Sequence, residues 1–269
     1  MVKALRVATR KGLFTFRRRG GEWKAGTPDF LGQPVTAVLD DARDGQLYAA
    51  LNLGHFGIKL HRSSDQGKTW TEVATPAFPP QEGDAATKPA VDQILTLVPG
   101  GWPGSLWAGT LPGGLFKSED RGKTWSLVES LWNMPEREKW MGGGYDKPVI
   151  HTVLVDPRHA DHLLVGVSTG GVWKSEDGSK PWRLVGKGLR AEYMPPAQAH
   201  DLLFQDVHRL SQCTVDPDVV WCQHHNGIFR STDRGETFKE LKSKPSVFGF
   251  AVAAHPDDPE VAWFVPAVK

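Results

Sequence analysis

Cysteine, long apolar runs and an excess of charge of either sign are all scarce in this sequence of 269 residues. Two cysteines cannot form the several disulfides of a small secreted scaffold. No apolar run approaches the ~18 residues of a membrane span, and the first ten residues lack the apolar segment of a signal peptide. The 32 basic and 31 acidic residues nearly cancel, so we expect no nucleic-acid or membrane partner. These scarcities favour a soluble, cytoplasmic protein.

Glycine, proline and tryptophan are abundant instead. The sequence has 29 Gly, 20 Pro and 11 Trp, a composition that suits many turns between short, aromatic-rich strands rather than helices. The two cysteines, Cys213 and Cys222, fall on the two arms of one expected hairpin. A turn centred on 217–218 would place them opposite each other. In a reducing compartment we expect two buried, free thiols.

One eight-residue pattern, S-x-D-x-G-x-T-W, recurs along the chain. Its first serines are 55, 57 and 56 residues apart, and a fixed period of this length is typical of repeat architectures. The third copy is degraded, because Pro181 stands where the others have threonine. The four copies are Ser63–Trp70, Ser118–Trp125, Ser175–Trp182 and Ser231–Phe238.

Each copy follows a short apolar strand, and a hairpin lies further upstream. The segment 153–167, for example, reads as two apolar strands around Asp156 and Pro157. A repeat therefore predicts four short strands, A to D, with the eight-residue box as the C–D turn. The box Asp would accept backbone N–H groups, its Gly would supply a positive φ and its Trp would pack on a neighbouring repeat. A single sheet of this kind leaves both faces unburied, so radial stacking is expected.

These boxes resemble the BNR/Asp-box families, which include sialidases, sortilin-type receptors, two-propeller xyloglucanases and photosystem II assembly factors. Several stretches also look like single-propeller, glycosyl-hydrolase-like BNR proteins, among them 108–116, 151–153 and 248–250. The resemblance implies an all-β fold: one β-propeller domain over 1–269, with about five to six four-stranded blades. It is specific for fold and a poor guide to function, because the boxes are structural turns.

The two ends of the chain leave the ring open to two interpretations. The first 25 residues supply strands B, C and D without A, and residues 247–265 supply an A–B hairpin. The last hairpin either completes the first blade in a five-bladed ring or begins a further blade. Truncation of a six- or seven-bladed parent is slightly favoured. An unclosed ring would expose sheet edges through which copies of the chain could associate.

Candidate site residues come from the B–C loops and the D–A connections, which gather on one rim in propellers of this type. Six of the ten histidines fall on this expected rim. Polar groups that converge from separate blades are the default site for a small-molecule or carbohydrate ligand. The candidate catalytic residues are Asp92, Asp206 and His151. The candidate ligand-binding residues are Arg10, His55, Gln93, Trp140, Tyr145, His208, Arg209, His224 and Asn226.

Two functions remain open at this point. One is a glycosyl-hydrolase-like protein that binds a small ligand such as a sugar, and the other is a binding or assembly scaffold. A sialidase is disfavoured, because the sequence has no R-I-P segment and only two rim arginines, Arg10 and Arg209. Imidazoles in this number could bind a transition metal, but no tight spacing supports a ligand set, so the sequence assigns no cofactor. A third interpretation is an incomplete, inactive relic.

Overall fold

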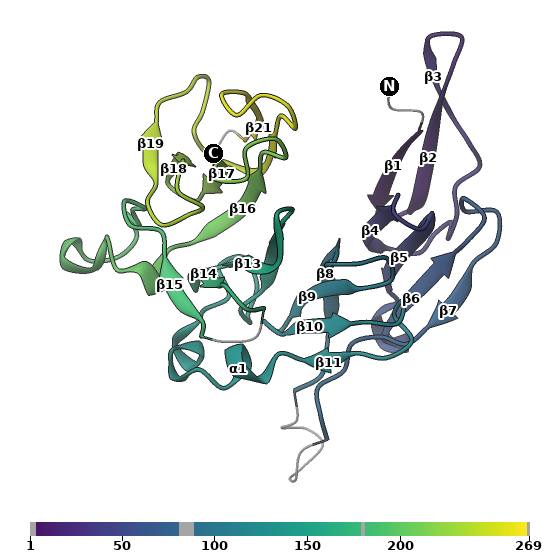
Figure 1. Cartoon of the computed structure of the whole chain (residues 1–269), viewed down its shortest axis with the longest axis horizontal. Coiled ribbons are helices and arrows are strands. Elements are labelled where there is room, and N and C mark those ends of the chain that lie inside the picture. Colours follow the sequence, from purple (N-terminus) through teal and green to yellow (C-terminus); the bar gives the residue numbers. More distant parts are fainter. Residues whose placement is uncertain (1–3, 81–88, 179–180, 268–269) are drawn as a thin grey trace. The chain divides into compact units, whose positions relative to one another are not determined.

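The structure is a computed structural model that describes residues 4–178 and 181–267, apart from the loop 81–88 (Figure 1). Nearly all regular structure is β, which confirms the predicted all-β class. The described chain divides into two compact units. Unit 1 comprises the described residues up to 112 together with 116–127, and unit 2 comprises 113–115 and the described residues from 128 onward. The extent of a single domain over 1–269 stays a prediction.

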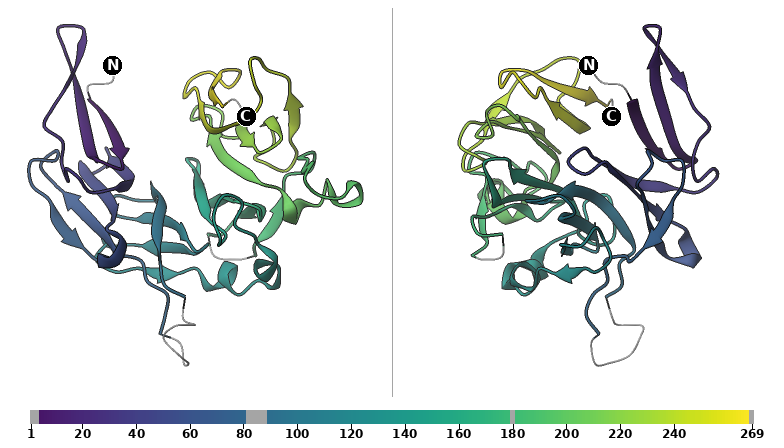
Figure 2. Two further views of the ribbon diagram at one scale, coloured as in Figure 1. Left: turned by 180° about the vertical axis from the view of Figure 1, so that it is seen from behind. Right: turned by 45° about the vertical axis from the view of Figure 1, so that its right-hand side comes forward.

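Unit 1 holds three antiparallel sheets in chain order, and each packs on the next (Figure 2). The first sheet has β1 (Ala4–Thr9), β2 (Gly12–Arg19) and β3 (Glu22–Ala25). The second has β4 (Val35–Asp41), β5 (Gln46–Asn52), β6 (Ile58–Ser63) and β7 (Thr71–Val73), with the 3-10 turn η1 (Gly54–Phe56). The third has β8 (Gln93–Pro99), β9 (Leu106–Leu111), β10 (Leu115–Ser118) and β11 (Ser126–Leu127).

Unit 2 holds two four-stranded sheets and a two-stranded one. The four-stranded sheets are β12 (Ile150–Asp156), β13 (His159–Val167), β14 (Gly171–Ser175) and β15 (Arg183–Val185), then β16 (Val207–Gln212), β17 (Val220–His224), β18 (Gly227–Ser231) and β19 (Lys239–Leu241). The last sheet pairs β20 (Gly249–Ala254) with β21 (Ala262–Pro266). Short helical turns lie in the long connections: α1 (Glu129–Trp132), η3 (Pro135–Lys139), η4 (Pro196–Gln198) and η5 (Leu202–Phe204).

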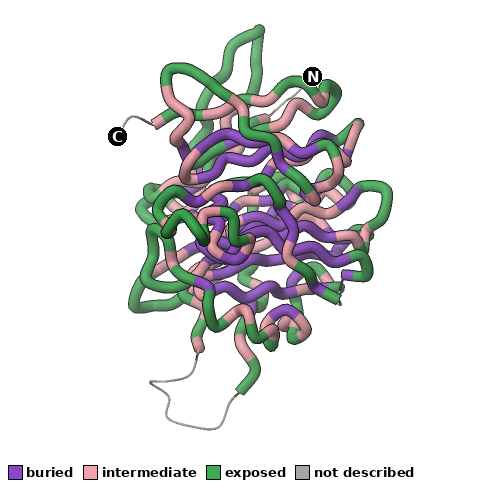
Figure 3. Tube along the Cα trace, turned by 90° about the vertical axis from the view of Figure 1, so that its left-hand side faces the viewer, coloured by how far each residue is buried: buried purple, intermediate pink, exposed green. Residues whose placement is uncertain are grey.

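Apolar side chains fill the space between consecutive sheets. In unit 1, Tyr48 and Leu60 of the second sheet meet Ile94 and Phe116 of the third. In unit 2, the sheets of β12–β15 and β16–β19 share a core of Leu164, Val172, Leu210, Cys222 and Phe229. Buried residues follow the strands and exposed ones the turns (Figure 3). Within each unit, consecutive antiparallel sheets pack face to face, which is the architecture of β-propeller blades, as predicted.

Among the described residues, four of the six sheets have four strands, the first has three and the last has two, which matches the partial repeats predicted for the first 25 residues and for 247–265. The closure of a ring and the truncation of a larger parent stay predictions. No helix among the described residues is long and apolar enough to cross a membrane.

The Asp box closes the C–D turn as its sequence predicts. In the second box, Asp120 Oδ1 accepts the N–H groups of Lys123 and Thr124, both at 2.9 Å, and Oδ2 accepts the Thr124 hydroxyl at 2.7 Å. The N–H of Gly122 (φ +77°) donates to Ser118 Oγ at 2.9 Å. In the first and fourth boxes the threonine N–H likewise donates to the box carboxylate, at 2.9 Å in both. Ser179 and Lys180 of the third box lie outside the described residues.

The box also bonds to the preceding sheet. The residue before the box glycine has a positive φ in the first, second and fourth boxes, where it is Gln66, Arg121 and Arg234. Arg121 Nε donates to Asp44 in the β4–β5 turn at 2.9 Å, and Arg234 Nε lies 3.2 Å from Asp156 at the end of β12. The box Trp125 donates its indole N–H to the Ala74 carbonyl at 2.9 Å. Neighbouring repeats are thus held by the turns as well as by the core.

Both cysteines are buried and free, as expected, but they are not opposite each other. Cys222 pairs with Leu210 in the β16–β17 register, whereas Cys213 lies beyond the strand and donates its N–H to the Val219 carbonyl at 3.1 Å. The predicted 213–222 pairing is therefore wrong. Residues 213–219 all belong to the connection between β16 and β17, which is longer than a tight turn centred on 217–218. Gln212 therefore pairs with Val220, and the register is shifted.

In five sheets the first strand has a one-residue β-bulge near its start. These strands are β4, β8, β12, β16 and β20. In β16, Val207 pairs with His224 and Arg209 with Gln223, so His208 between them has no opposite residue. The residue before each bulge is buried, whereas the bulge residue itself is not. A bulge re-aims the side chain that it carries. The five bulge residues are Thr36, Leu95, His151, His208 and Phe250.

Replacing the box carboxylate should destabilise the protein. We expect Asp120→Ala to lower the free energy of unfolding by about 1–3 kcal/mol, because the turn N–H groups lose their acceptor. The neighbouring Glu119→Ala removes only an exposed ion pair with Lys117 and should change it by less than about 0.5 kcal/mol. Urea unfolding of both variants measures the difference. Equal losses would mean that the box bonds contribute nothing specific.

Acid should weaken the contact between the turn of β12–β13 and the next box. Although burial alone would raise it, the bonds and charge of Arg158, with the charge of Arg234, lower the pKa of Asp156 from 3.8 to about 2. Because the folded value is depressed, the stabilisation is complete above pH ~4 and is lost as the pH falls towards 2. Wild type should exceed Asp156→Asn by on the order of 1–2 kcal/mol at pH 6, and the gap should shrink by pH 2.5. A gap of constant size in urea titrations would contradict this account.

Candidate functional site

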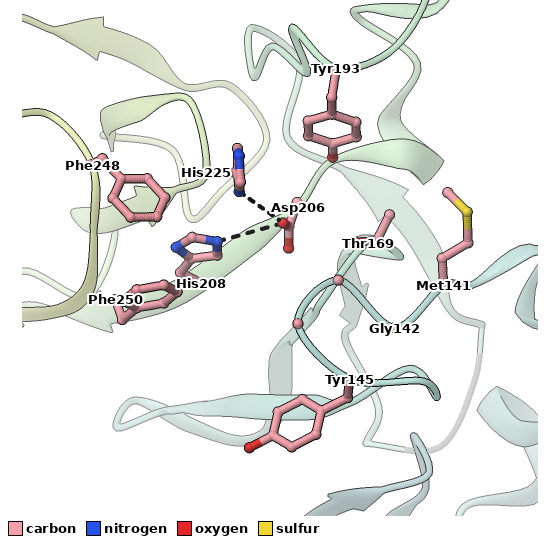
Figure 4. Close-up of a pocket in the computed structure, with 12 residues that line it drawn as sticks. Met141, Gly142, Tyr145, Thr169, Tyr193, Asp206, His208, His225, Phe248 and Phe250 are labelled. Carbon is pink, nitrogen blue, oxygen red and sulfur yellow. Dashed lines mark ion pairs between the residues drawn. The ribbon is translucent and has the colours of Figure 1, made fainter. Parts of the chain in front are cut away.

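A cavity of about 560 Å³ opens in unit 2 between the loops at one end of its sheets (Figure 4). Its volume is in the range of small-molecule sites. One polar cluster and several aromatic rings form its walls. The lining residues are Met141, Gly142, Gly143, Gly144, Tyr145, Thr169, Tyr193, Asp206, His208, His225, Phe248 and Phe250.

The polar cluster consists of Asp206, His208 and His225. Asp206 directly precedes β16, and the bulge at His208 turns that imidazole towards the same carboxylate. His225 lies in the β17–β18 turn, where its backbone N–H donates to the Asp206 carbonyl at 3.0 Å. Two segments that are neighbours in the sheet thus bring three ionisable side chains together.

Asp206 lies between the two imidazoles. His208 Nε2 is 3.5 Å and His225 Nδ1 3.4 Å from Asp206 Oδ2, as the dashed lines in Figure 4 show. Burial would raise the pKa of this carboxyl, but the hydrogen bond and charge of His208 lower it instead. Asp206 is therefore a buried carboxylate at neutral pH.

The sheet of β20 and β21 fixes the orientation of His208. The Gly249 carbonyl lies 2.6 Å from His208 Nδ1, so this nitrogen carries the donating proton. The Phe250 ring stacks on the imidazole with centroids 4.6 Å apart and an interplanar angle of 14°. Phe248 meets both His208 and His225 edge-on. The imidazole is therefore held on one face and at one edge.

Tyr193 and the glycine loop, residues 142–144, complete the walls. Tyr193 contacts His225 edge-on, and its hydroxyl donates to the Phe204 carbonyl at 2.5 Å. Burial raises the pKa of Tyr193, so the phenol stays protonated. Gly143 has φ +53°, and a Cβ there would lie 3.4 Å from Asp206 Oδ1. Glycine adopts this positive φ without strain and leaves the space beside the carboxylate unfilled.

Three of the residues selected from sequence line this cavity: Tyr145, Asp206 and His208. Five others belong to unit 2 without being among its lining residues. Trp140 is buried against Trp173, with ring centroids 5.7 Å apart. Arg209 donates to the His151 carbonyl at 2.9 Å. These contacts are structural in kind.

His151 and His224 are held neutral by their surroundings. Burial, with the charge of Arg209, lowers the pKa of His151 to about 4. Burial lowers the pKa of His224 to about 3, and its Nδ1 accepts the Asn226 N–H at 3.1 Å. Asn226 in turn accepts the Glu192 N–H at 2.9 Å. This bond connects the β17–β18 turn to the 190s loop, which is the part of the β15–β16 connection that contains Glu192 and Tyr193.

The remaining four selected residues belong to unit 1. Arg10 is exposed in the β1–β2 turn, and His55 is exposed in η1. Asp92 is exposed, with its N–H bonded to the Leu111 carbonyl at 2.7 Å. Gln93 begins β8 and accepts from Asn52 at 3.4 Å.

The sequence-based selection omitted several lining residues. His225 was on the expected rim but was passed over for its neighbours His224 and Asn226. The adjacent pair His224–His225 was a usable signal, because one of two consecutive residues at a strand end must turn away from the core. Tyr193, Phe248 and Phe250 carried no local signal of this kind.

Comparison with known proteins supports the repeat assignment. The family model described as the BNR-Asp box repeat matches residues 115–128 and 228–241. The chain is 34% identical over 153 residues to a probable oligoxyloglucan-reducing end-specific xyloglucanase from Neosartorya fischeri. That alignment covers 56% of this chain and only 17% of the relative.

Solved structures share the fold at low identity. A GH74 xyloglucanase from Xanthomonas campestris matches with a TM-score of 0.56 and 17% identity, over 98% of this chain and 49% of that one. A chain of a nidogen/laminin complex matches with a TM-score of 0.60 and 10% identity, over 97% and 84%. At these identities the likeness concerns architecture. The chain thus carries BNR-Asp box repeats, shares the β-propeller fold of these structures and is similar to a xyloglucanase over part of its length.

Proposed function

We propose that the protein binds a carbohydrate in the cavity of unit 2. The observation that carries this proposal is the combination of aromatic rings and a polar cluster in one small-molecule-sized cavity. A pyranose ring presents apolar C–H groups on its faces and hydroxyls at its edge. It therefore suits a site whose walls are aromatic and whose polar groups are few and convergent.

The aromatic residues come from three separate segments. Tyr145 directly follows the glycine loop, Tyr193 belongs to the 190s loop, and Phe248 and Phe250 to the start of β20; Figure 4 shows them on different sides of Asp206. Tyr145 and Phe250 are 48% and 62% exposed, so their faces are accessible to a ligand. The Asp206 carboxylate can accept hydrogen bonds from hydroxyls, and the His225 imidazole can accept or donate them.

The cavity supports binding better than glycosidic hydrolysis by two carboxylates. Such hydrolysis needs a general acid and a second carboxylate about 5–10 Å from it. Among the described residues that line the cavity, Asp206 is the one carboxylate. The similarity to a probable xyloglucanase makes xyloglucan oligosaccharides the first compounds to test.

A binding or assembly scaffold remains the second candidate. It is favoured by exposed apolar side chains on the β20–β21 sheet, where Trp263 and Val265 are 56% and 65% exposed. The two candidates differ in which residues matter. Carbohydrate binding depends on the cavity, whereas a scaffold would depend on Trp263 and its neighbours.

Removing an aromatic wall should weaken carbohydrate binding. We expect Tyr145→Ala to raise the dissociation constant for xyloglucan oligosaccharides roughly threefold to tenfold, the value of one aromatic contact. Trp263→Ala is the matched control, because this exposed aromatic lies in the same unit but not among the cavity residues. Isothermal titration calorimetry measures both.

Binding lost in Trp263→Ala and kept in Tyr145→Ala would move the site to the β20–β21 sheet. The absence of binding to any member of a glycan array would overturn the carbohydrate proposal. Reducing-end release from the same oligosaccharides, assayed in parallel, separates binding from hydrolysis.

A further inference from the structure

The polar cluster of the cavity has the composition and spacing of a metal site. We propose that Asp206, His208 and His225 bind a divalent transition-metal ion. Their ligand atoms all lie within 4.8 Å of one another. Imidazole nitrogen and carboxylate oxygen together suit first-row divalent ions, and Zn²⁺ accepts both. The inference goes beyond carbohydrate binding, because the ion can be measured without any sugar.

The protonation of His208 provides the first argument. Because the Gly249 carbonyl can only accept, His208 Nδ1 carries the proton of that 2.6 Å bond. In neutral imidazole the other nitrogen, Nε2, then presents a lone pair, and this nitrogen faces Asp206. Metal-binding histidines typically donate their second N–H to a backbone carbonyl in this way, which fixes the tautomer and the ring.

The distances provide the second argument. The separations of 3.5 Å and 3.4 Å from Asp206 Oδ2 exceed the usual 2.7–3.2 Å of an N–H···O bond. Two ligands of a tetrahedral ion, each bound at about 2.1 Å, lie about 3.4 Å apart. These two separations thus match edges of a coordination tetrahedron.

The surroundings provide the third argument. Asp206 is 7% exposed, and a buried carboxylate needs a cationic partner. Phe250 stacks on His208, and Tyr193 and Phe248 contact His225 edge-on, so both imidazoles are held in place by aromatic rings. Rigid ligands lose little freedom when they bind an ion.

The arrangement leaves the ion accessible. Three protein ligands occupy three positions of a tetrahedral site, and a fourth position is available for water or a ligand oxygen. All three residues line the cavity, where Gly143 leaves open the approach to Asp206. The ion would therefore meet whatever the cavity holds.

The test is a titration of the untagged chain with Zn²⁺, after treatment with a chelator and dialysis, against a chromophoric competitor. We expect one ion per chain. His208→Ala and His225→Ala should each weaken binding by more than about 100-fold, since even the loss of a second partner behind a ligand costs 10–100-fold. His255→Ala, a histidine at the end of β20 in the same unit, is the matched control and should bind as wild type does.

A folded variant keeps the test decisive if an alanine variant unfolds. Asp206→Asn keeps the size of the side chain and removes its charge, and Zn²⁺ should raise the melting temperature of wild type but not of this variant. No stoichiometric binding by wild type, or equal binding by wild type and all three cluster variants, would overturn the proposal. Neither result bears on carbohydrate binding, which Tyr145→Ala tests separately.

Discussion

The carboxylate of the Asp box is the interaction on which the rest of the structure depends. Asp120 and its counterparts Asp65 and Asp233 accept the N–H groups of a turn that would otherwise leave them unpaired. The closed turn fixes the positive-φ residue before the glycine, and the side chain of that residue reaches the preceding sheet. A bond inside one turn therefore also sets how consecutive repeats meet, and both sheet faces become buried as a result.

The candidate site depends on how the β16–β19 sheet meets the β20–β21 sheet. Asp206, His208 and His225 come from the β16–β19 sheet, but Gly249 and Phe250, which orient His208, come from the next one. The 190s loop and the glycine loop close the remaining sides. Each of these segments is a connection between repeats or a turn within one. The repeats supply a rigid frame, and the chemistry lies on the segments that join them.

Sequence reasoning predicted the fold well because its signals are local. The box of 118–125 contains its own acceptor, glycine and threonine, and the hairpin strands show apolar periodicity. The prediction failed where non-local geometry decides. The 213–222 pairing depended on a turn whose size the sequence does not show. His225 and Phe250 meet His208 only because the β17–β18 turn and β20 both lie beside the bulge. Asp206 and His208 were found, since loop position alone was enough to select them.

The repeated bulge places a buried residue directly before one that is not buried, at the same point of five sheets. In each of five sheets the flanking residue before the bulge is buried in the frame, while the bulge residue itself is released from it. The residue at the bulge differs between sheets: it is threonine at 36, leucine at 95, histidine at 151 and 208, and phenylalanine at 250. One bulge position per sheet can therefore carry a different kind of side chain, and in the β16–β19 sheet that side chain is His208 of the candidate site.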